Sequence, residues 1–186
     1  NSKQYVFYMS TLLSKGRNRI MEFVVDNPTK EIKVRQLARE LRLSPAHVSR
    51  TLEILKKCKV LVNGRVDLSN PYARALKIFF NVKKLIEEDV VKAFKELEVL
   101  GIGVYGSWAN GTNNEDSDLD IWVKVDKHPG EMKIASVENS VRRALGRDVQ
   151  TLVLAPDRIE RMRKEDPIFY YSLAYGSFVI SGESIE

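Results

Sequence analysis

Cysteine is almost missing from this sequence, because Cys58 is the only one among 186 residues. A single cysteine excludes an internal disulfide and suits a reducing compartment such as the cytoplasm. With only two histidines, His47 and His128, the chain also has no Cys/His zinc cluster and no arguable Ser-His-Asp triad. Cys58 falls on the apolar face of a predicted helix, so we expect it to be a small core residue.

Long apolar runs and the lysine motif of P-loop proteins are missing too. No stretch approaches the length that spans a bilayer, and the N-terminal residues lack the apolar centre of a secretion signal. We therefore expect a cytoplasmic protein. The chain is 44% hydrophobic and 30% charged, which is enough apolar material to bury a core and argues against disorder.

Charge is distributed unevenly along the chain. Residues 1–70 hold 14 Lys/Arg and 6 Asp/Glu, a net +8, whereas residues 71–186 hold 16 and 19, a net −3. A basic front half joined to an acidic back half suggests a nucleic-acid-facing module attached to a different kind of domain. The alternative is that solvated Lys and Arg simply gather in the first part.

The first seventy residues carry helix signals followed by a hairpin signal. Ser44 before Pro45 predicts a helix start, with the serine as N-cap and the proline at the first helical position. Asn63-Gly64 between short apolar runs is the strongest short-range signal for a hairpin. The apolar spacing predicts helices over 10–26, 34–41 and 45–59, then strands over 60–62 and 65–68.

This order of elements, with the stretch LARELRLSPAHVSRTLEIL, resembles a winged helix-turn-helix domain. The resemblance implies binding to double-stranded DNA, with the helix from Pro45 in the major groove. It indicates five candidate nucleic-acid-binding residues: Ser44, His47, Ser49, Arg50 and Arg65. Winged helices also serve as protein-binding and dimerisation modules, so that alternative stays open.

The second half alternates helices and strands. Asn70-Pro71 marks a boundary, after which helices over 72–87 and 89–98 link the domains or pack between two subunits. The pattern then predicts strands over 99–105, 119–125, 149–154 and 178–180, with helices over 107–110, 131–145, 156–164 and 167–174. We expect an α+β protein of three segments: a winged helix-turn-helix domain over 1–70, linking helices over 71–98, and a small mixed-sheet domain with flanking helices over 99–186.

The stretch GSWANGTNNEDSDLDIWV, residues 106–123, concentrates the chemistry. Because residues two apart on a strand point to the same side, Asp118 and Asp120 project together while Leu119 points into the core. Two carboxylates at this spacing suit a hard cation such as Mg²⁺, which prefers oxygen ligands and substrate phosphates. Gly106 lets a phosphate approach the backbone, and Ser107 adds a hydroxyl.

Gly106-Ser107, a ten-residue spacer and Asp118-Leu119-Asp120 resemble the signature of the polymerase-beta-like nucleotidyltransferases, especially the minimal and kanamycin-type branch. The resemblance covers roughly residues 90–182. It implies transfer of a nucleoside monophosphate from a triphosphate such as ATP, with two Mg²⁺ ions held by Asp118 and Asp120. It also places the donor phosphates near Gly106, Ser107 and Asn110.

Two positions depart from that family pattern. Minimal members have an arginine where this chain has Asn110, so a fixed positive charge near the phosphates is missing. The family also has a third carboxylate on the next strand, and the apolar neighbours align Gln150 with it. A neutral amide is no general base. Asp148, two residues earlier on the same face, is the candidate substitute as third catalytic residue, if the strand is shifted or bulged.

Three functions follow as hypotheses. The first is a Mg²⁺-dependent nucleotidyltransferase, moving AMP from ATP to an unknown acceptor, which the resemblance suggests is a protein in some members. The second is a DNA-binding regulator whose degenerate nucleotidyltransferase-like domain only senses nucleotide or metal. The third is a dimeric assembly module that uses residues 72–98 as its interface.

Overall fold

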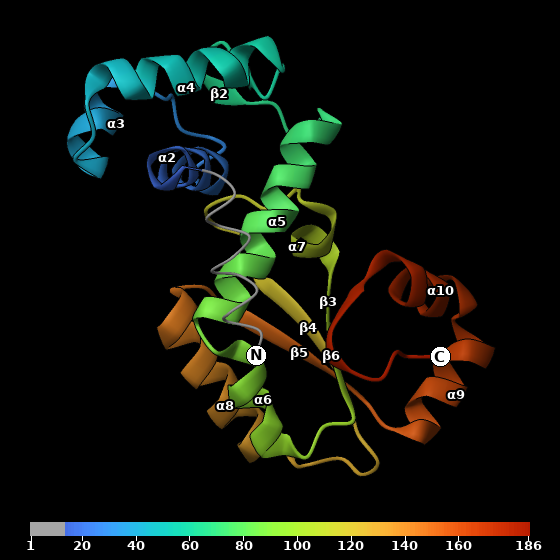
Figure 1. The fold of residues 1–186 in the computed structure, drawn as a ribbon. Helices are drawn as coiled ribbons and strands as arrows, with labels where there is room; N and C mark the ends of the chain where they lie inside the picture. The colour runs from blue at the N-terminus through green and yellow to red at the C-terminus, as the bar shows by residue number, and fades with distance from the viewer. Residues whose placement is uncertain (1–13) are drawn as a thin grey trace. The chain divides into compact units, whose positions relative to one another are not determined.

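The computed structural model describes residues 14–186, and the chain forms two compact units, one up to Lys83 and one from Lys84 (Figure 1). Helix α5 (Pro71–Glu87) runs across this division as a single helix. The boundaries that we predicted at 70/71 and 98/99 stay a prediction. Within the described residues, no helix combines the length and apolar character that a membrane span requires.

The first unit is a small helical bundle with a two-stranded hairpin. Its elements before α5 are α2 (Lys15–Asp26), α3 (Val34–Leu41), α4 (Pro45–Lys57), β1 (Leu61–Val62) and β2 (Arg65–Val66). The hairpin is antiparallel, and its turn residues Asn63 and Gly64 have φ of 51° and 79°, as a tight hairpin turn requires. The predicted helices and hairpin agree with these elements, although residues 10–13 of the first predicted helix lie outside the described residues.

Cys58 is exposed, so its predicted place in the core was wrong. The core of this unit does take Val48, Leu52 and Leu55 from α4. Although Cys58 continues that spacing, α4 ends at Lys57, and Lys59 adopts φ of 55°, which turns the chain away. The cysteine therefore caps the helix end instead of packing beneath it.

The second unit is built on a four-stranded mixed sheet in the order β5-β4-β3-β6. Its elements after α5 are α6 (Val90–Phe94), a 3₁₀ turn η1 (Lys95–Leu97), β3 (Gly101–Tyr105), α7 (Gly106–Asn110), β4 (Leu119–Lys124), α8 (Glu131–Leu145), β5 (Val149–Leu154), α9 (Pro156–Glu165), α10 (Pro167–Gly176) and β6 (Phe178–Gly182). Strand β3 pairs antiparallel with β4 and β6, whereas β4 and β5 are parallel. The α+β class is confirmed.

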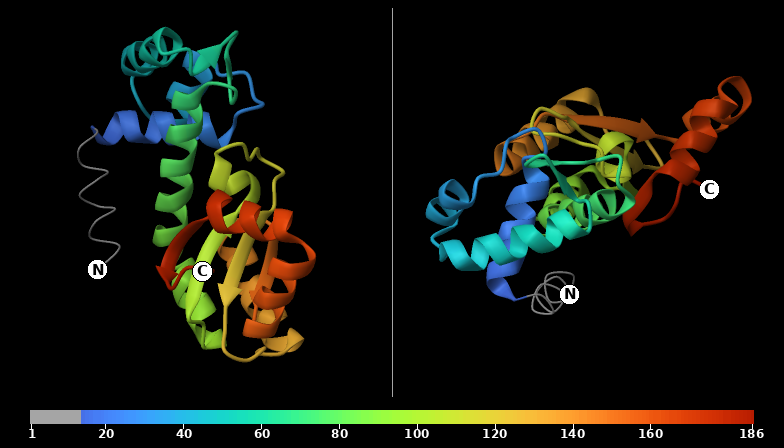
Figure 2. Two further views of the ribbon diagram at one scale, coloured as in Figure 1. Left: turned by 90° about the vertical axis from the view of Figure 1, so that its right-hand side faces the viewer. Right: turned by 90° about the horizontal axis from the view of Figure 1, so that it is seen from above.

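Helices cover both faces of this sheet (Figures 1 and 2). On one face α6 and α8 pack on Leu119, Ile121 and Val123 of β4. On the other, α9 and α10 pack around Trp122, whose indole N–H donates to Ser177 Oγ at 2.9 Å. The face of β4 toward α6 and α8 is fully buried, whereas the other face carries the buried Trp122 between the partly exposed Asp120 and Lys124.

Candidate functional site

The turn between β3 and α7 is shaped around a carboxylate. Gly106 has φ of +67°, in the left-handed region that favours glycine. A Cβ added there would collide with Oδ2 of Asp120, which faces this turn from the neighbouring strand, opposite Tyr105. Only a glycine allows the Asp120 carboxylate to lie directly against the Gly-Ser turn.

Asp118 and Asp120 share one face at the start of β4. Leu119 between them is fully buried in the core on the opposite face, so both acids project to the side of Trp122. Burial raises the pKa of Asp120 above its usual range, and the negative charge of Asp118 raises it further. The structure thus brings the two predicted metal-binding residues together, close enough to repel each other.

The third strand presents an amide at this site. The parallel register of β4 and β5 places Gln150 opposite Asp120, and Gln150 Nε2 donates to Asp118 Oδ2 at 2.8 Å. Asp148 Oδ1 pairs with Arg142 Nε on α8 at 2.7 Å, and its role as a third catalytic carboxylate stays a prediction. Among residues 14–186 no group of three or more His, Cys, Asp or Glu could hold a metal, which leaves Asp118 and Asp120 as a pair.

The predicted phosphate-binding residues surround the same turn. Ser107 is half-buried in the first turn of α7, where its carbonyl accepts from Thr112 N at 2.9 Å, and Asn110 at the end of α7 is exposed. Tyr105 precedes the turn, and burial and the charge of Asp120 raise its pKa while Arg158 opposes the rise. Arg158 is therefore a cation on this face that sequence reasoning missed, because α9 contributes no motif.

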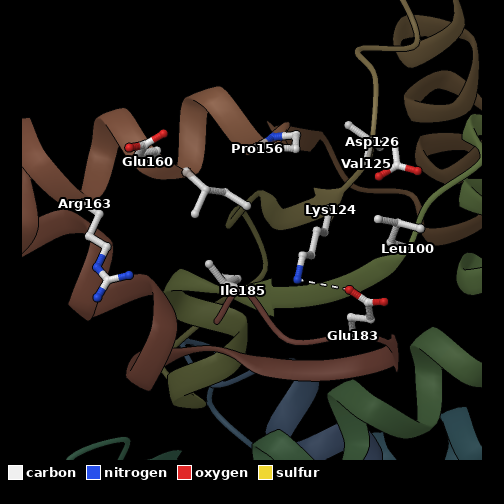
Figure 3. A pocket seen from close by; sticks show the side chains of 10 residues that line it. Leu100, Lys124, Val125, Asp126, Pro156, Glu160, Arg163, Glu183 and Ile185 are labelled. Atoms are coloured by element: carbon white, nitrogen blue, oxygen red, sulfur yellow. Dashed lines mark ion pairs between the residues drawn. The ribbon is translucent and has the colours of Figure 1, made fainter.

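The second unit also has a groove away from the acidic pair. This groove of about 600 Å³ opens at the other end of β4, where Lys124 pairs with Glu183 at 3.1 Å (Figure 3). Lys124 and Asp120 are four residues apart, which is about 13 Å along a strand. The groove is separate from the acidic pair, and we assign the chemistry to the pair because it carries the convergent oxygen ligands.

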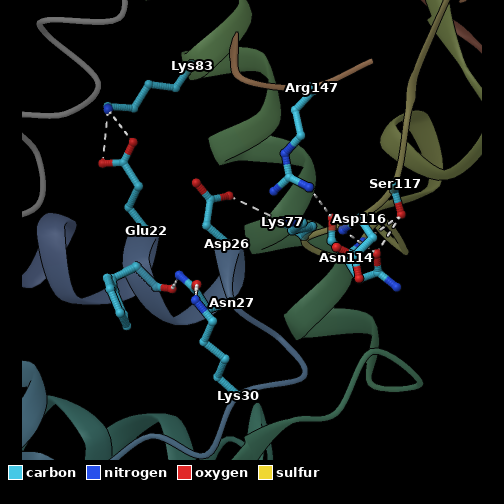
Figure 4. A network of polar contacts seen from close by, with 11 residues as sticks. Glu22, Asp26, Asn27, Lys30, Lys77, Lys83, Asn114, Asp116, Ser117 and Arg147 are labelled. Carbon is cyan, nitrogen blue, oxygen red and sulfur yellow. Dashed lines mark hydrogen bonds and ion pairs between the residues drawn. The ribbon is translucent and has the colours of Figure 1, made fainter. Parts of the chain in front are cut away.

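The loop that leads into Asp118 is held by Arg147, another residue that the sequence pattern did not indicate. Arg147 Nη1 donates to the carbonyl of Asn114 at 3.0 Å (Figure 4). The Asn114 side chain in turn accepts from Asp116 N at 2.9 Å and from Ser117 Oγ at 3.1 Å. These bonds fix the loop immediately before Asp118, and the Asp118 carboxylate itself is held by Gln150.

The candidate nucleic-acid-binding residues of the first unit differ in availability. Ser44 Oγ caps α4 by accepting from His47 N at 3.3 Å. His47 packs against Gly16, and its Nε2 is buried without a hydrogen-bond partner among the described residues. Ser49 is half-buried, whereas Arg50 on α4 and Arg65 on β2 are exposed. The two arginines are thus the members of the predicted set best placed to reach a phosphate.

Comparison with known families identifies both halves. Residues 84–173 match the family model described as nucleotidyltransferase domain, and residues 14–61 match the one described as bacterial regulatory protein, arsR family. Searches of curated proteins and of solved structures found no match for this chain. The predicted fusion is confirmed at the level of these matches: a helix-turn-helix match is followed in the chain by a nucleotidyltransferase-domain match.

Proposed function

We propose that the second domain is a Mg²⁺-dependent nucleotidyltransferase that transfers AMP from ATP to an acceptor. The acceptor group belongs to a protein side chain or to a nucleic acid. The observation that carries the proposal is the Asp118–Asp120 pair, of which the Asp120 carboxylate lies against the Gly106 turn. The single cysteine of the chain supports a reducing cytoplasmic location.

The acidic pair suits a divalent cation. Both donors are carboxylate oxygens, the ligands that Mg²⁺ prefers, and their mutual repulsion is relieved by a positive charge between them. When bound, Mg²⁺ would neutralise charge on the triphosphate. Asp118 and Asp120 would hold the cation, the Gly106 backbone would leave room for a phosphate, and the Ser107 hydroxyl would donate to it.

The residues around the pair limit the chemistry. We leave Asp148 out of the catalytic set because Arg142 holds it. Gln150 stands where a third carboxylate would accept the acceptor's proton, and an amide does not take up protons. The proposed reaction therefore requires an acceptor group that is already nucleophilic, or one that loses its proton to solvent.

The test is pyrophosphate release from ATP with Mg²⁺, with the full chain and candidate acceptors. Asp118→Asn and Asp120→Asn should each lower the rate by at least roughly 100-fold, since losing even a residue that only hydrogen-bonds to a metal ligand costs 10- to 100-fold. Asp126→Asn is the matched control, because Asp126 is exposed beyond the far end of β4. Equal rates in all variants would remove the enzyme proposal.

A second candidate is a DNA-binding regulator that binds nucleotide without transferring it. Gln150 in the third-carboxylate position and the exposed Asn110 favour it, because both lack the charge that catalysis uses. It predicts that ATP and Mg²⁺ bind, that Asp118→Asn weakens this binding, and that wild type releases no pyrophosphate with any acceptor. Detectable pyrophosphate release that depends on Asp118 would contradict it.

A further inference from the structure

The side chain of Gln150 competes with a cation for one oxygen atom. An ionised carboxylate only accepts hydrogen bonds, so the amide must turn its NH₂ group toward Asp118 Oδ2, and it does so at 2.8 Å. A divalent cation shared by Asp118 and Asp120 would sit where both carboxylates converge. The positive charge would repel the NH₂ group and attract the amide oxygen.

Gln150 has the freedom to respond. It is exposed, and its bond to Asp118 is the one hydrogen bond that its side chain makes within the described part of the chain. Its neighbours Val149 and Thr151 face the opposite side of the sheet, where Val149 packs in the core. The amide can therefore rotate or swing away while β5 stays in place.

We infer that Gln150 is a latch on Asp118: its amide holds Oδ2 of Asp118 until a divalent cation displaces it, and this competition weakens cation binding at the acidic pair. The inference rests on the proposed function, because it takes Asp118 and Asp120 as the cation ligands. Gln150 is then a positioning residue that sets the cation concentration at which the site loads.

The experiment measures Mn²⁺ affinity of the full chain by electron paramagnetic resonance, without nucleotide. Gln150→Ala frees Oδ2, so Mn²⁺ should bind roughly tenfold more tightly than in wild type, since hydrogen bonds to charged groups are among the stronger ones. Gln36→Ala is the matched control, because it removes the same amide from an exposed position on α3. Its affinity should equal that of wild type.

A second variant guards against loss of packing in Gln150→Ala. Gln150→Met keeps the length of the side chain and removes the donor without adding a charge, so Mn²⁺ should again bind more tightly than in wild type. A merely structural role for Gln150 would leave the Mn²⁺ affinity of Gln150→Met unchanged.

The outcomes separate the two proposals. Unchanged Mn²⁺ affinity in Gln150→Ala overturns the latch while leaving the proposed function standing. Weaker affinity also overturns the latch, because Gln150 would then be a ligand through its amide oxygen. Absence of Mn²⁺ binding in wild type and in every variant overturns the latch and the proposed cation site together.

Discussion

At the scale of single residues, the negative charge at the start of β4 lowers the stability of the folded state. Asp118 and Asp120 face the same way, Asp120 is partly buried, and its raised pKa reports that the folded state disfavours its charge. Gly106 adds a conformation that other residues avoid. Like-charge repulsion of this kind is common at functional sites, where a bound cation relieves it.

The first prediction concerns Asp120→Asn. Because folding raises the pKa of Asp120 above 3.8, the folded state binds protons more strongly, so stability falls as pH rises through this range and the penalty is complete above the folded pKa. At pH 7 in EDTA the variant should gain about 1–3 °C in Tm, a small change because solvent screens a partly exposed carboxylate. Near pH 3 the gain should vanish, and thermal melts at both values measure it. An equal gain in Asp126→Asn would contradict the explanation.

The second prediction uses two glycines with nearly the same backbone. Gly106 and Gly146 have φ of +67° and +64°, but a Cβ at Gly146 meets nothing within 4 Å, whereas one at Gly106 meets the Asp120 carboxylate. Both alanine variants should lose about 1–2 kcal/mol of stability from the backbone strain. Only Gly106→Ala should also weaken Mn²⁺ binding. Equal Mn²⁺ affinity in both variants would show that the contact with Asp120 has no role in the site.

At the scale of elements, the outer edge of β5 is protected by side chains. An edge strand presents unpaired backbone groups that attract other chains. Here Glu138 on α8 accepts from Thr151 N at 2.9 Å, and Arg158 on α9 donates to Val153 O at 3.0 Å. Helix α8, which precedes β5, and helix α9, which follows it, thus provide hydrogen-bond partners for backbone groups on this edge. They also hold the strand that carries Gln150 in register with β4.

The third prediction is that Glu138→Ala loosens β5. Thr151 N would lose a charge-assisted partner at a half-buried position, which should cost about 1–3 kcal/mol. Hydrogen exchange at Thr151 should accelerate together with exchange along β5. Glu165→Ala at the exposed end of α9 is the control and should leave Tm within about 1 °C. Unchanged hydrogen exchange at Thr151 would contradict a role for Glu138 in holding this edge of β5.

The elements could be predicted because their ends carry local signals. Ser44-Pro45, Asn63-Gly64 and Gly146 each fix a backbone conformation by their own chemistry. The Asp118–Asp120 pair could be predicted in the same way, from the two-residue repeat of a strand.

What sequence reasoning missed depends on contacts between distant segments. His47 looked like a surface residue of α4, but Gly16 of α2 leaves room for its ring. The two-residue repeat of a strand puts Asp148 on the face of the acidic pair, yet its carboxylate forms an ion pair with Arg142 on α8. Arg147 and Arg158 act on backbone carbonyls, which no sequence pattern encodes.

At the scale of the whole molecule, the distribution of charge and the two family matches divide the chain into the same two parts. The basic first seventy residues contain the whole helix-turn-helix match, and the acidic remainder contains the nucleotidyltransferase match. Positive charge on the first domain suits the phosphates of DNA, whereas under the proposed function the second domain holds its nucleotide through Mg²⁺. The two functions should therefore respond in opposite ways to ionic conditions: salt weakens the first, and divalent cations promote the second.

The fourth prediction tests the DNA contact of Arg50. Binding of the full chain to a duplex of about 20 base pairs should weaken linearly on a log–log plot against salt, because each phosphate contact releases condensed counterions. Arg50→Ala should reduce that slope by about 1, since it removes one such contact. Arg163→Ala removes the same charge from an exposed position on α9, so its slope should equal that of wild type. Equal losses in both variants would mean that the net charge of the chain, and not the helix-turn-helix surface, holds the DNA.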